Sequence, residues 1–163
     1  PFRTHFLAGA LALAALPAAA MDGIVVKDAY ARSSGAMAAS GAAFMVIENH
    51  TGADDRLVGA VSNVSERTEL HTHREDDAGV MRMIHVEEGF DLPAGGTIEM
   101  RRGGQHVMFL GLSEPFEQGD TLSLTLDFET AGEVTVEVPV DLERMPAHGG
   151  GMSGHGNQMS HGN

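Results

Sequence analysis

The sequence predicts an all-β fold, an antiparallel sandwich or barrel, followed by a C-terminal tail without a fold of its own. Short runs rich in Val, Ile, Thr and Leu alternate with polar residues, and clusters of Gly, Asp and Pro separate these runs. Beyond the first twenty residues, no long segment repeats apolar residues at helical spacing. About nine short strands spaced roughly ten residues apart are typical of an antiparallel sandwich or barrel.

The expected elements follow in order along the chain. Residues 1–20 combine a basic start, an apolar run over 6–16 and small residues at 18–20, which predicts a secretory signal peptide cleaved after Ala20. We therefore expect an exported protein whose folded domain spans 21–144. Strands are expected at 24–30, 42–48, 56–61, 67–73, 80–86, 97–101, 106–112, 121–128 and 133–140.

Alternation is clearest in the last two of these strands. Along 121–128 every second residue is Leu or Phe, and 133–138 alternates Val with Glu or Thr. Such alternation buries one face of a strand. Met37, Met45 and Met100 are expected to fill the core, as lone Met residues usually do. His50 falls in the turn 49–55, where we expect it to be solvated.

Residues 145–163 are rich in Gly and carry few apolar side chains other than Met. Such a segment cannot bury enough apolar surface to fold, so we expect a disordered tail. Its potential metal ligands are His148, Met152, His155, Met159 and His161. The alternative interpretation is a plain solubilising tail.

Composition excludes several classes of function. The chain has 23 Asp and Glu against ten Lys and Arg, a formal charge of −13, which opposes binding to nucleic acid or anionic membranes and favours metal cations. The absence of Cys excludes disulfides, thiolate nucleophiles, zinc fingers, iron–sulfur clusters and blue-copper electron transfer. No catalytic motif appears, and the paired acids Asp76-Asp77 and Glu87-Glu88 fall in turns, so we do not expect an enzyme. Ten Met and nine His remain as candidate ligands.

Three predicted strands place His and Met side chains on one face each, because residues two apart point the same way. A hairpin through the acidic turn 74–79 would make the first two of these faces adjacent. The three sets are His71 with His73, then Met81 with Met83 and His85, and then His106 with Met108.

The chemistry of this set is narrow. Thioether sulfur is a soft, neutral ligand that suits Cu(I), and imidazole binds copper in either oxidation state. In an oxidising compartment thioethers persist where a Cys pair would form a disulfide. The spacing therefore predicts a Cu(I) site, in which His73 and Met81 are alternative ligands because they share faces with the others. The expected ligands are His71, Met83, His106 and Met108.

The same residues carry a resemblance to the PCu(A)C family of periplasmic copper chaperones, whose signature is roughly H(M)x10Mx21HxM. His71 matches the first His, Met83 the middle Met, and His106 with Met108 the closing HxM. Thr72 stands at the optional Met, and 22 residues rather than 21 separate Met83 from His106. The resemblance covers essentially all of 23–141, including the stretches RLVGAVSNVSERTELHTH, GVMRMIHVE and LPAGGTIEMRRGGQHVMFLGL.

The resemblance implies a cupredoxin-like Greek-key β-sandwich in the periplasm that binds one Cu(I) near its surface. It also implies delivery of copper to the CuA centre in subunit II of cytochrome c oxidase, alongside a Sco-type protein. The tail resembles extensions that add a second site able to hold Cu(II). An alternative function with the same ligands is a periplasmic copper buffer that serves tolerance, has no specific acceptor and relies mainly on its tail.

Overall fold

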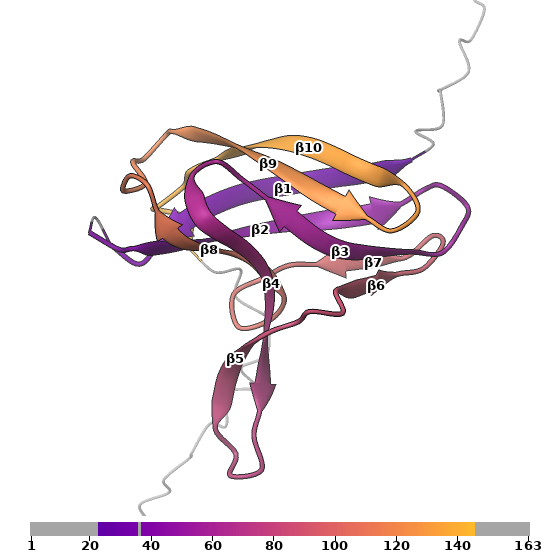
Figure 1. Cartoon of the computed structure of the whole chain (residues 1–163), viewed down its shortest axis with the longest axis horizontal. Helices are drawn as coiled ribbons and strands as arrows, with labels where there is room; N and C mark the ends of the chain where they lie inside the picture. The colour runs from indigo at the N-terminus through magenta and orange to yellow at the C-terminus, as the bar shows by residue number, and fades with distance from the viewer. Residues whose placement is uncertain (1–22, 36, 146–163) are drawn as a thin grey trace, which may run out of the picture.

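Ten β-strands and no helix form the part of the chain that this computed structural model describes, residues 23–145 without residue 36 (Figure 1). The expected signal segment 1–20 and tail residues 146–163 lie outside the described residues. The strands are β1 (Ile24–Ser33), β2 (Ser40–Asn49), β3 (Asp55–Val61), β4 (Ser65–Glu75), β5 (Met81–His85), β6 (Phe90–Leu92), β7 (Thr97–Glu99), β8 (His106–Leu112), β9 (Thr121–Phe128) and β10 (Gly132–Pro139).

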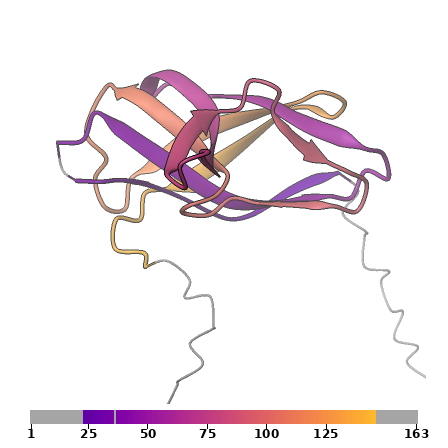
Figure 2. The same ribbon diagram turned by 90° about the horizontal axis from the view of Figure 1, so that it is seen from below.

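The strands form two antiparallel sheets that pack face to face (Figure 2). One sheet has the order β1-β2-β8-β4-β5, with β7 pairing to β2, and the other has the order β10-β9-β3-β6. Some neighbours are consecutive strands, whereas β2 with β8, β8 with β4 and β9 with β3 come from distant parts of the sequence, as in a Greek key. The predicted antiparallel β-sandwich is confirmed. Within the described range, no helix is long and apolar enough to cross a membrane.

The core lies between the two sheets, where alternate residues of each strand point inward. The predicted face of β9 is buried, with Leu124 and Leu126 wholly inaccessible and Phe128 2% exposed. The other sheet contributes Val107 and Phe109 of β8, both also wholly buried. Burial of each large apolar side chain stabilises the fold by roughly 1.5–3 kcal/mol.

All nine predicted strands are present, and the short strand β6 was not predicted. Met45 and Met100 fill the core as expected, at 2% and 5% exposure. The expectation for Met37 is wrong, because this side chain is 90% exposed. It lies in the connection between β1 and β2, outside the alternating backbone that turns side chains towards the core. His50 is exposed, as predicted, and contacts Glu48 at 2.9 Å.

The hairpin of β4 and β5 projects from the sandwich as an arm (Figure 1). The first half of β4 pairs with β8 up to His71, and beyond that point β4 pairs with β5 alone. His71 therefore stands where the arm joins the body, opposite His106 on one side and His85 on the other. At the tip, Gly79 adopts a φ of 78°, a left-handed conformation that Gly adopts at little cost.

After β10 the chain runs along the open edge of β1, where Val140 bridges to Ala31. The backbone N–H of Asp141 donates to the oxygen of Ala31 at 2.9 Å. Further along, the guanidinium of Arg144 lies 4.2 Å from the centre of the Tyr30 ring. Tyr30 in turn packs on Phe44 of β2, with ring centres 5.2 Å apart. The last described residues therefore lie beside β1, next to the strand β2 that carries Phe44.

Candidate metal centre

Alternation along β4 places His71 and His73 on the outer face of the six-stranded sheet. Leu70, between Glu69 and His71, points the other way and is 2% exposed in the core. Because successive strand residues point to opposite faces, burial of Leu70 fixes His71 and His73 outward. The predicted shared face is confirmed.

The register of the arm brings Met83 to this face. His73 pairs directly with Met83, and Glu75 pairs with Met81 nearer the tip. Asp76 holds the turn, since its Oδ1 accepts from the backbone N–H of Ala78 at 3.0 Å and of Val80 at 2.9 Å. The predicted hairpin thus sets Met83 against β4 and places Met81 two residue pairs further out.

β8 contributes His106 and Met108 from the body of the sandwich. Val107, between these two residues, and Phe109, after Met108, are buried in the core. Because successive strand residues point to opposite faces, His106 and Met108 point outward. His106 pairs with His71 across the sheet. Although it lies on the outer face, His106 is only 3% exposed, because the arm and neighbouring aromatic rings cover it; the Phe44 ring centre is 6.0 Å away.

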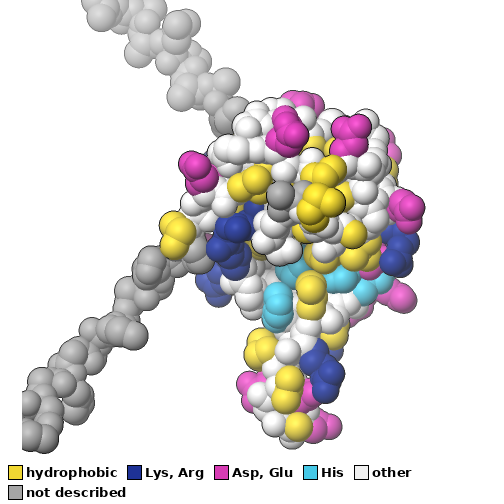
Figure 3. All heavy atoms as spheres, turned by 90° about the vertical axis from the view of Figure 1, so that its left-hand side faces the viewer, with side chains coloured by type: hydrophobic (Ala, Val, Ile, Leu, Met, Phe, Trp, Pro, Cys, Tyr) yellow, Lys and Arg dark blue, Asp and Glu magenta, His cyan; other side chains and the backbone are white. Residues whose placement is uncertain are grey.

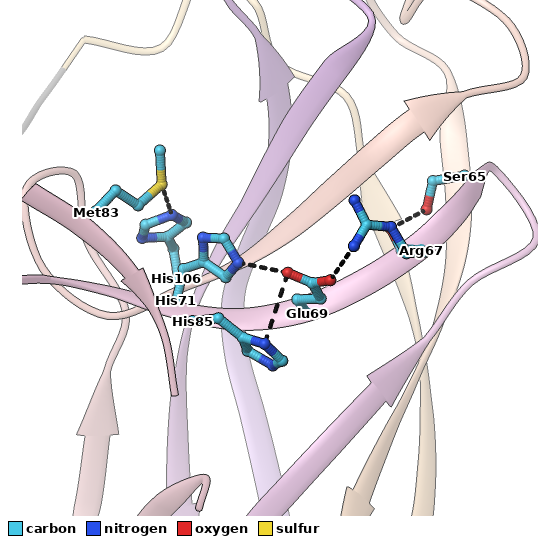
Figure 4. A network of polar contacts seen from close by, with 7 residues as sticks. All are labelled: Ser65, Arg67, Glu69, His71, Met83, His85 and His106. Atoms are coloured by element: carbon cyan, nitrogen blue, oxygen red, sulfur yellow. Dashed lines mark hydrogen bonds and ion pairs between the residues drawn. The ribbon is translucent and has the colours of Figure 1, made fainter. Parts of the chain in front are cut away.

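The two nitrogens of His106 have different partners, and Figure 4 shows the one towards Met83. Nδ1 lies 2.9 Å from the backbone oxygen of Gly104, and Nε2 lies 3.2 Å from Sδ of Met83. A carbonyl oxygen only accepts, so the proton of the neutral ring resides on Nδ1. Nε2 and Sδ then face each other with lone pairs and no proton between them. A soft cation bound to both atoms would satisfy them together.

Burial lowers the pKa of His106 below its ordinary value, and the nearby His71 and His73 lower it further. The hydrogen bond to Gly104 acts in the opposite direction but does not outweigh burial. His106 is therefore neutral at neutral pH, the state in which imidazole binds a metal.

His71 and His73 each keep a buried Nδ1 with no hydrogen-bond partner among the described residues. Their rings lie near His106, with centres 5.8 Å away for His71 and 5.5 Å for His73. Buried polar atoms are normally hydrogen-bonded, so two unsatisfied nitrogens beside one residue indicate a missing partner. Imidazole nitrogens in this state are available as metal ligands.

His73, Met83, His106 and Met108 line one hollow of about 220 Å³, which we call the metal hollow. Its wall is completed by Ala42, Phe44, Arg102 and Gly103. His71 adjoins it without lining it, and Met81 lies outside it at 56% exposure. A larger hollow of about 410 Å³ beside residues 113–116 and 120–122 carries neither His nor Met.

Glu69 connects His71 and His85 in a network that sequence reasoning missed (Figure 4). Its Oε2 lies 2.8 Å from Nε2 of His71 and 3.9 Å from Nδ1 of His85. The bond with His71 lowers the pKa of Glu69, so the carboxylate is charged at neutral pH. A carboxylate on one ring nitrogen orients the ring and leaves the other nitrogen as the metal ligand. The two-residue spacing from His71 is the signal that could have revealed Glu69.

Within the described range, no three His, Asp or Glu side chains converge in a geometry able to hold a metal ion. Met83 and Met108 line the same hollow as His73 and His106, so thioether and imidazole ligands are available together on this face. The predicted tail ligands, which lie outside the described residues, are His148, Met152, His155, Met159 and His161.

Comparison with known proteins places these features in a family. Residues 24–140 match the family model of LpqE-like lipoproteins. A protein of Leifsonia xyli subsp. xyli, named as a lipoprotein, is 33% identical over 129 residues, which cover 79% of this chain and 76% of the relative.

Solved structures share the fold. The copper-bound PCuAC domain from PmoF2 aligns with a TM-score of 0.60 and 25% identity, over 76% of this chain and 96% of that domain. The Cu(I) form of DR1885 from Deinococcus radiodurans aligns with a TM-score of 0.57 and 27% identity, over 73% of this chain and 78% of that protein.

Proposed function

The chain belongs to the LpqE-like family and shares the cupredoxin-like fold of PCuAC domains, and from this premise we propose that it is a copper chaperone carrying Cu(I). The contact between Nε2 of His106 and Sδ of Met83, 3.2 Å long, carries the proposal. It joins a neutral imidazole to a thioether, a pair that suits a soft monovalent ion and is a poor site for Mg²⁺, Ca²⁺ or Zn²⁺.

The proposed ligands are Met83, His106, Met108 and, from β4, His71. His71 is preferred because its Nε2 is held by Glu69, while its buried Nδ1 has no partner among the residues that the structure describes. This is the pattern of a metal-binding imidazole with an orienting carboxylate. His73 lines the metal hollow and is the competing ligand. His71→Ala should therefore weaken Cu(I) binding more than His73→Ala, and the reverse order would assign the role to His73.

The proposed mechanism is ligand exchange rather than catalysis. Met83 is 46% exposed and lies on β5, at the edge of its sheet. A thiolate of an acceptor could approach from this side, bind Cu(I) and displace the thioethers in turn. Because the stronger ligand retains the ion, copper passes to the acceptor without release into solvent.

We place this activity in the periplasm, after export, with the CuA centre of cytochrome c oxidase subunit II as acceptor and a Sco-type protein as co-worker. Support comes from the family resemblance and from the lipoprotein names of the family and the relative. We also propose that the tail adds a second site, able to hold Cu(II), because its imidazoles suit that ion.

Copper transfer tests the proposed delivery. The Cu(I)-loaded whole chain is mixed anaerobically with the reduced apo CuA domain of subunit II, with and without a Sco-type protein. Ferricyanide is then added as a one-electron oxidant, and the absorption of the mixed-valence CuA centre is recorded. We expect copper to leave this chain and the CuA absorption to develop. If this chain retains its copper under both conditions, and the number of copper ions that it binds depends on the tail, the copper buffer would be favoured instead.

A further inference from the structure

A group of arginines lies beside the metal hollow in a chain that is otherwise strongly acidic. The sequence has 23 Asp and Glu against ten Lys and Arg. Lys and Arg side chains nevertheless gather on the same face as the His side chains (Figure 3). On that face the acidic side chains lie towards the periphery and at the tip of the arm.

Two of these arginines converge on a single backbone oxygen. Nη1 of Arg32, from β1, donates to the oxygen of Arg144 at 3.1 Å, and Nη2 of Arg102, from the loop before β8, donates to the same atom at 3.0 Å. The two donor nitrogens are therefore within about 6 Å of each other. Arg144 itself pairs with Asp28.

Neither Arg32 nor Arg102 forms an ion pair with any acidic side chain in the described part of the chain. Both side chains are half-buried. Like charges held close together at a partly desolvated site repel each other more strongly than in bulk water. A negatively charged ligand would relieve this repulsion.

The two guanidinium groups border a hollow of about 420 Å³, which we call the arginine pocket. Two hydroxyl side chains in its wall, Ser34 and Ser40, supply further hydrogen-bond donors, whereas the hydroxyl of Ser33 already donates to the backbone oxygen of Gly35 at 3.2 Å. The residues that matter here are Arg32, Arg102, Ser34, Ser40 and Met108.

The arginine pocket adjoins the metal hollow. The two share Ala42, Phe44, Arg102 and Met108 in their walls. A group held in the arginine pocket would therefore lie next to the proposed copper ligand Met108. Any protein that takes copper from the metal hollow must approach this same face.

We propose that the arginine pocket binds a carboxylate from an acidic segment of the copper-accepting protein. This inference rests on the proposed function and specifies the chemistry of the partner's surface. The planar guanidinium matches a carboxylate with two parallel hydrogen bonds, which gives the contact direction as well as strength. A protein segment is favoured over an anionic bilayer, because a narrow segment can reach the pocket without meeting the acidic side chains at the periphery of this face, whereas an extended bilayer would be repelled by them.

Binding of an acetylated hexaglutamate peptide to the whole chain tests this inference, with the Arg Nε–H signals followed by NMR. We expect the peptide to shift the signals of Arg32 and Arg102, and its affinity to fall with added salt. Arg32→Gln should weaken binding about tenfold through loss of charge-assisted bonds. The matched control is Lys27→Gln, which removes the same charge from β1 at an exposed residue paired with Glu48 and should have little effect.

Equal weakening by Arg32→Gln and Lys27→Gln would overturn the inference, because only overall charge would then matter. Binding of inorganic phosphate, or of vesicles of phosphatidylcholine and phosphatidylglycerol, at the pocket in preference to the peptide would also overturn it. Arg102→Gln provides a second variant if Arg32→Gln fails to fold, and it should likewise weaken binding of the peptide.

Cu(I) affinity, measured separately, distinguishes this inference from the proposed function. Arg32 does not line the metal hollow, so Arg32→Gln should keep the Cu(I) affinity of the unchanged chain while its affinity for the peptide falls. An unchanged chain that binds the peptide at the arginine pocket but takes up no Cu(I) would contradict the copper chaperone and leave the pocket standing.

Discussion

At the scale of single residues, His106 combines three properties of a metal-binding imidazole. Its Nδ1 bonds to the oxygen of Gly104, which leaves Nε2 as the free nitrogen. Burial lowers its pKa, so it is neutral at neutral pH. Its free nitrogen already contacts Sδ of Met83. Each property follows from the position of His106 on β8 beneath the arm.

The lowered pKa of His106 predicts how the metal-free protein responds to acid. Below the ordinary His pKa of about 6.5, the unfolded chain binds the proton that folded His106 resists, so the free energy of unfolding falls as pH decreases. Urea unfolding between about pH 7.5 and pH 5 measures this change. His106→Gln should show a smaller loss of stability over the same range. An identical loss in both proteins would mean that His106 does not contribute.

Glu69 predicts an effect on copper binding through His71. Glu69→Gln removes the charge that orients the imidazole and should weaken Cu(I) binding by about 10–100-fold, as loss of such carboxylates does at other metal sites. Competition with a chromophoric chelator measures the affinity, and ¹⁵N NMR of the His71 ring reports whether its proton stays on one nitrogen. Glu75→Gln, on the same face of β4 nearer the tip, is the control. Equal affinities in the two variants would remove Glu69 from the site.

At the scale of elements, alternation along β8 places residues that stabilise the core on one face and proposed copper ligands on the other. Met108 points to the metal hollow, whereas its neighbour Phe109 is wholly buried in the core. Phe109→Ala should cost about 3–5 kcal/mol of unfolding free energy. Met108→Leu keeps the volume but removes the sulfur, so it should cost less than about 1.5 kcal/mol and weaken Cu(I) binding. Denaturant unfolding and copper titration of both variants check this separation, which fails if Met108→Leu leaves the affinity unchanged.

Alternation in the sequence was sufficient to predict the strands and the faces of their His and Met residues. The period of two in β8 and β9 sets which side chains enter the core, and the structure follows it. The acidic turn likewise predicted the hairpin that sets Met83 opposite His73. These features depend on local sequence, which is why they could be read without a structure.

Features that depend on tertiary packing could not be predicted. β6 spans only three residues, which is too short for an alternating pattern to be recognised in the sequence. It forms by pairing with β3. Met37 and Met45 are both lone Met residues in the sequence, but Met37 lies in the loop between β1 and β2, outside the sheet. The pairing of β4 with β8, which brings His71 to His106, joins segments far apart in the sequence. The arginine pocket arises in the same way, because β1, β2, β8 and the loop before β8 all contribute to its wall.

At the scale of the whole molecule, the sandwich supports a soft-ligand site on one outer face. The core and the metal hollow lie on opposite faces of the same strands, so the site can change without loss of the fold. The arm covers His106 and leaves Met83 partly exposed at a sheet edge. This arrangement suits an ion that has to be held securely and still passed on.

The most direct test of the central claim is an anaerobic Cu(I) competition titration of the chain with its tail ligands replaced. Those replacements are His148→Ala, Met152→Ala, His155→Ala, Met159→Ala and His161→Ala. In this background we expect one tightly bound Cu(I), and Met83→Leu or His106→Gln should weaken it more than about tenfold. Met37→Leu, at a residue that is 90% exposed, should leave the Cu(I) affinity unchanged. A chain that binds no Cu(I) once the tail is replaced would contradict the account and make the tail the copper-binding part.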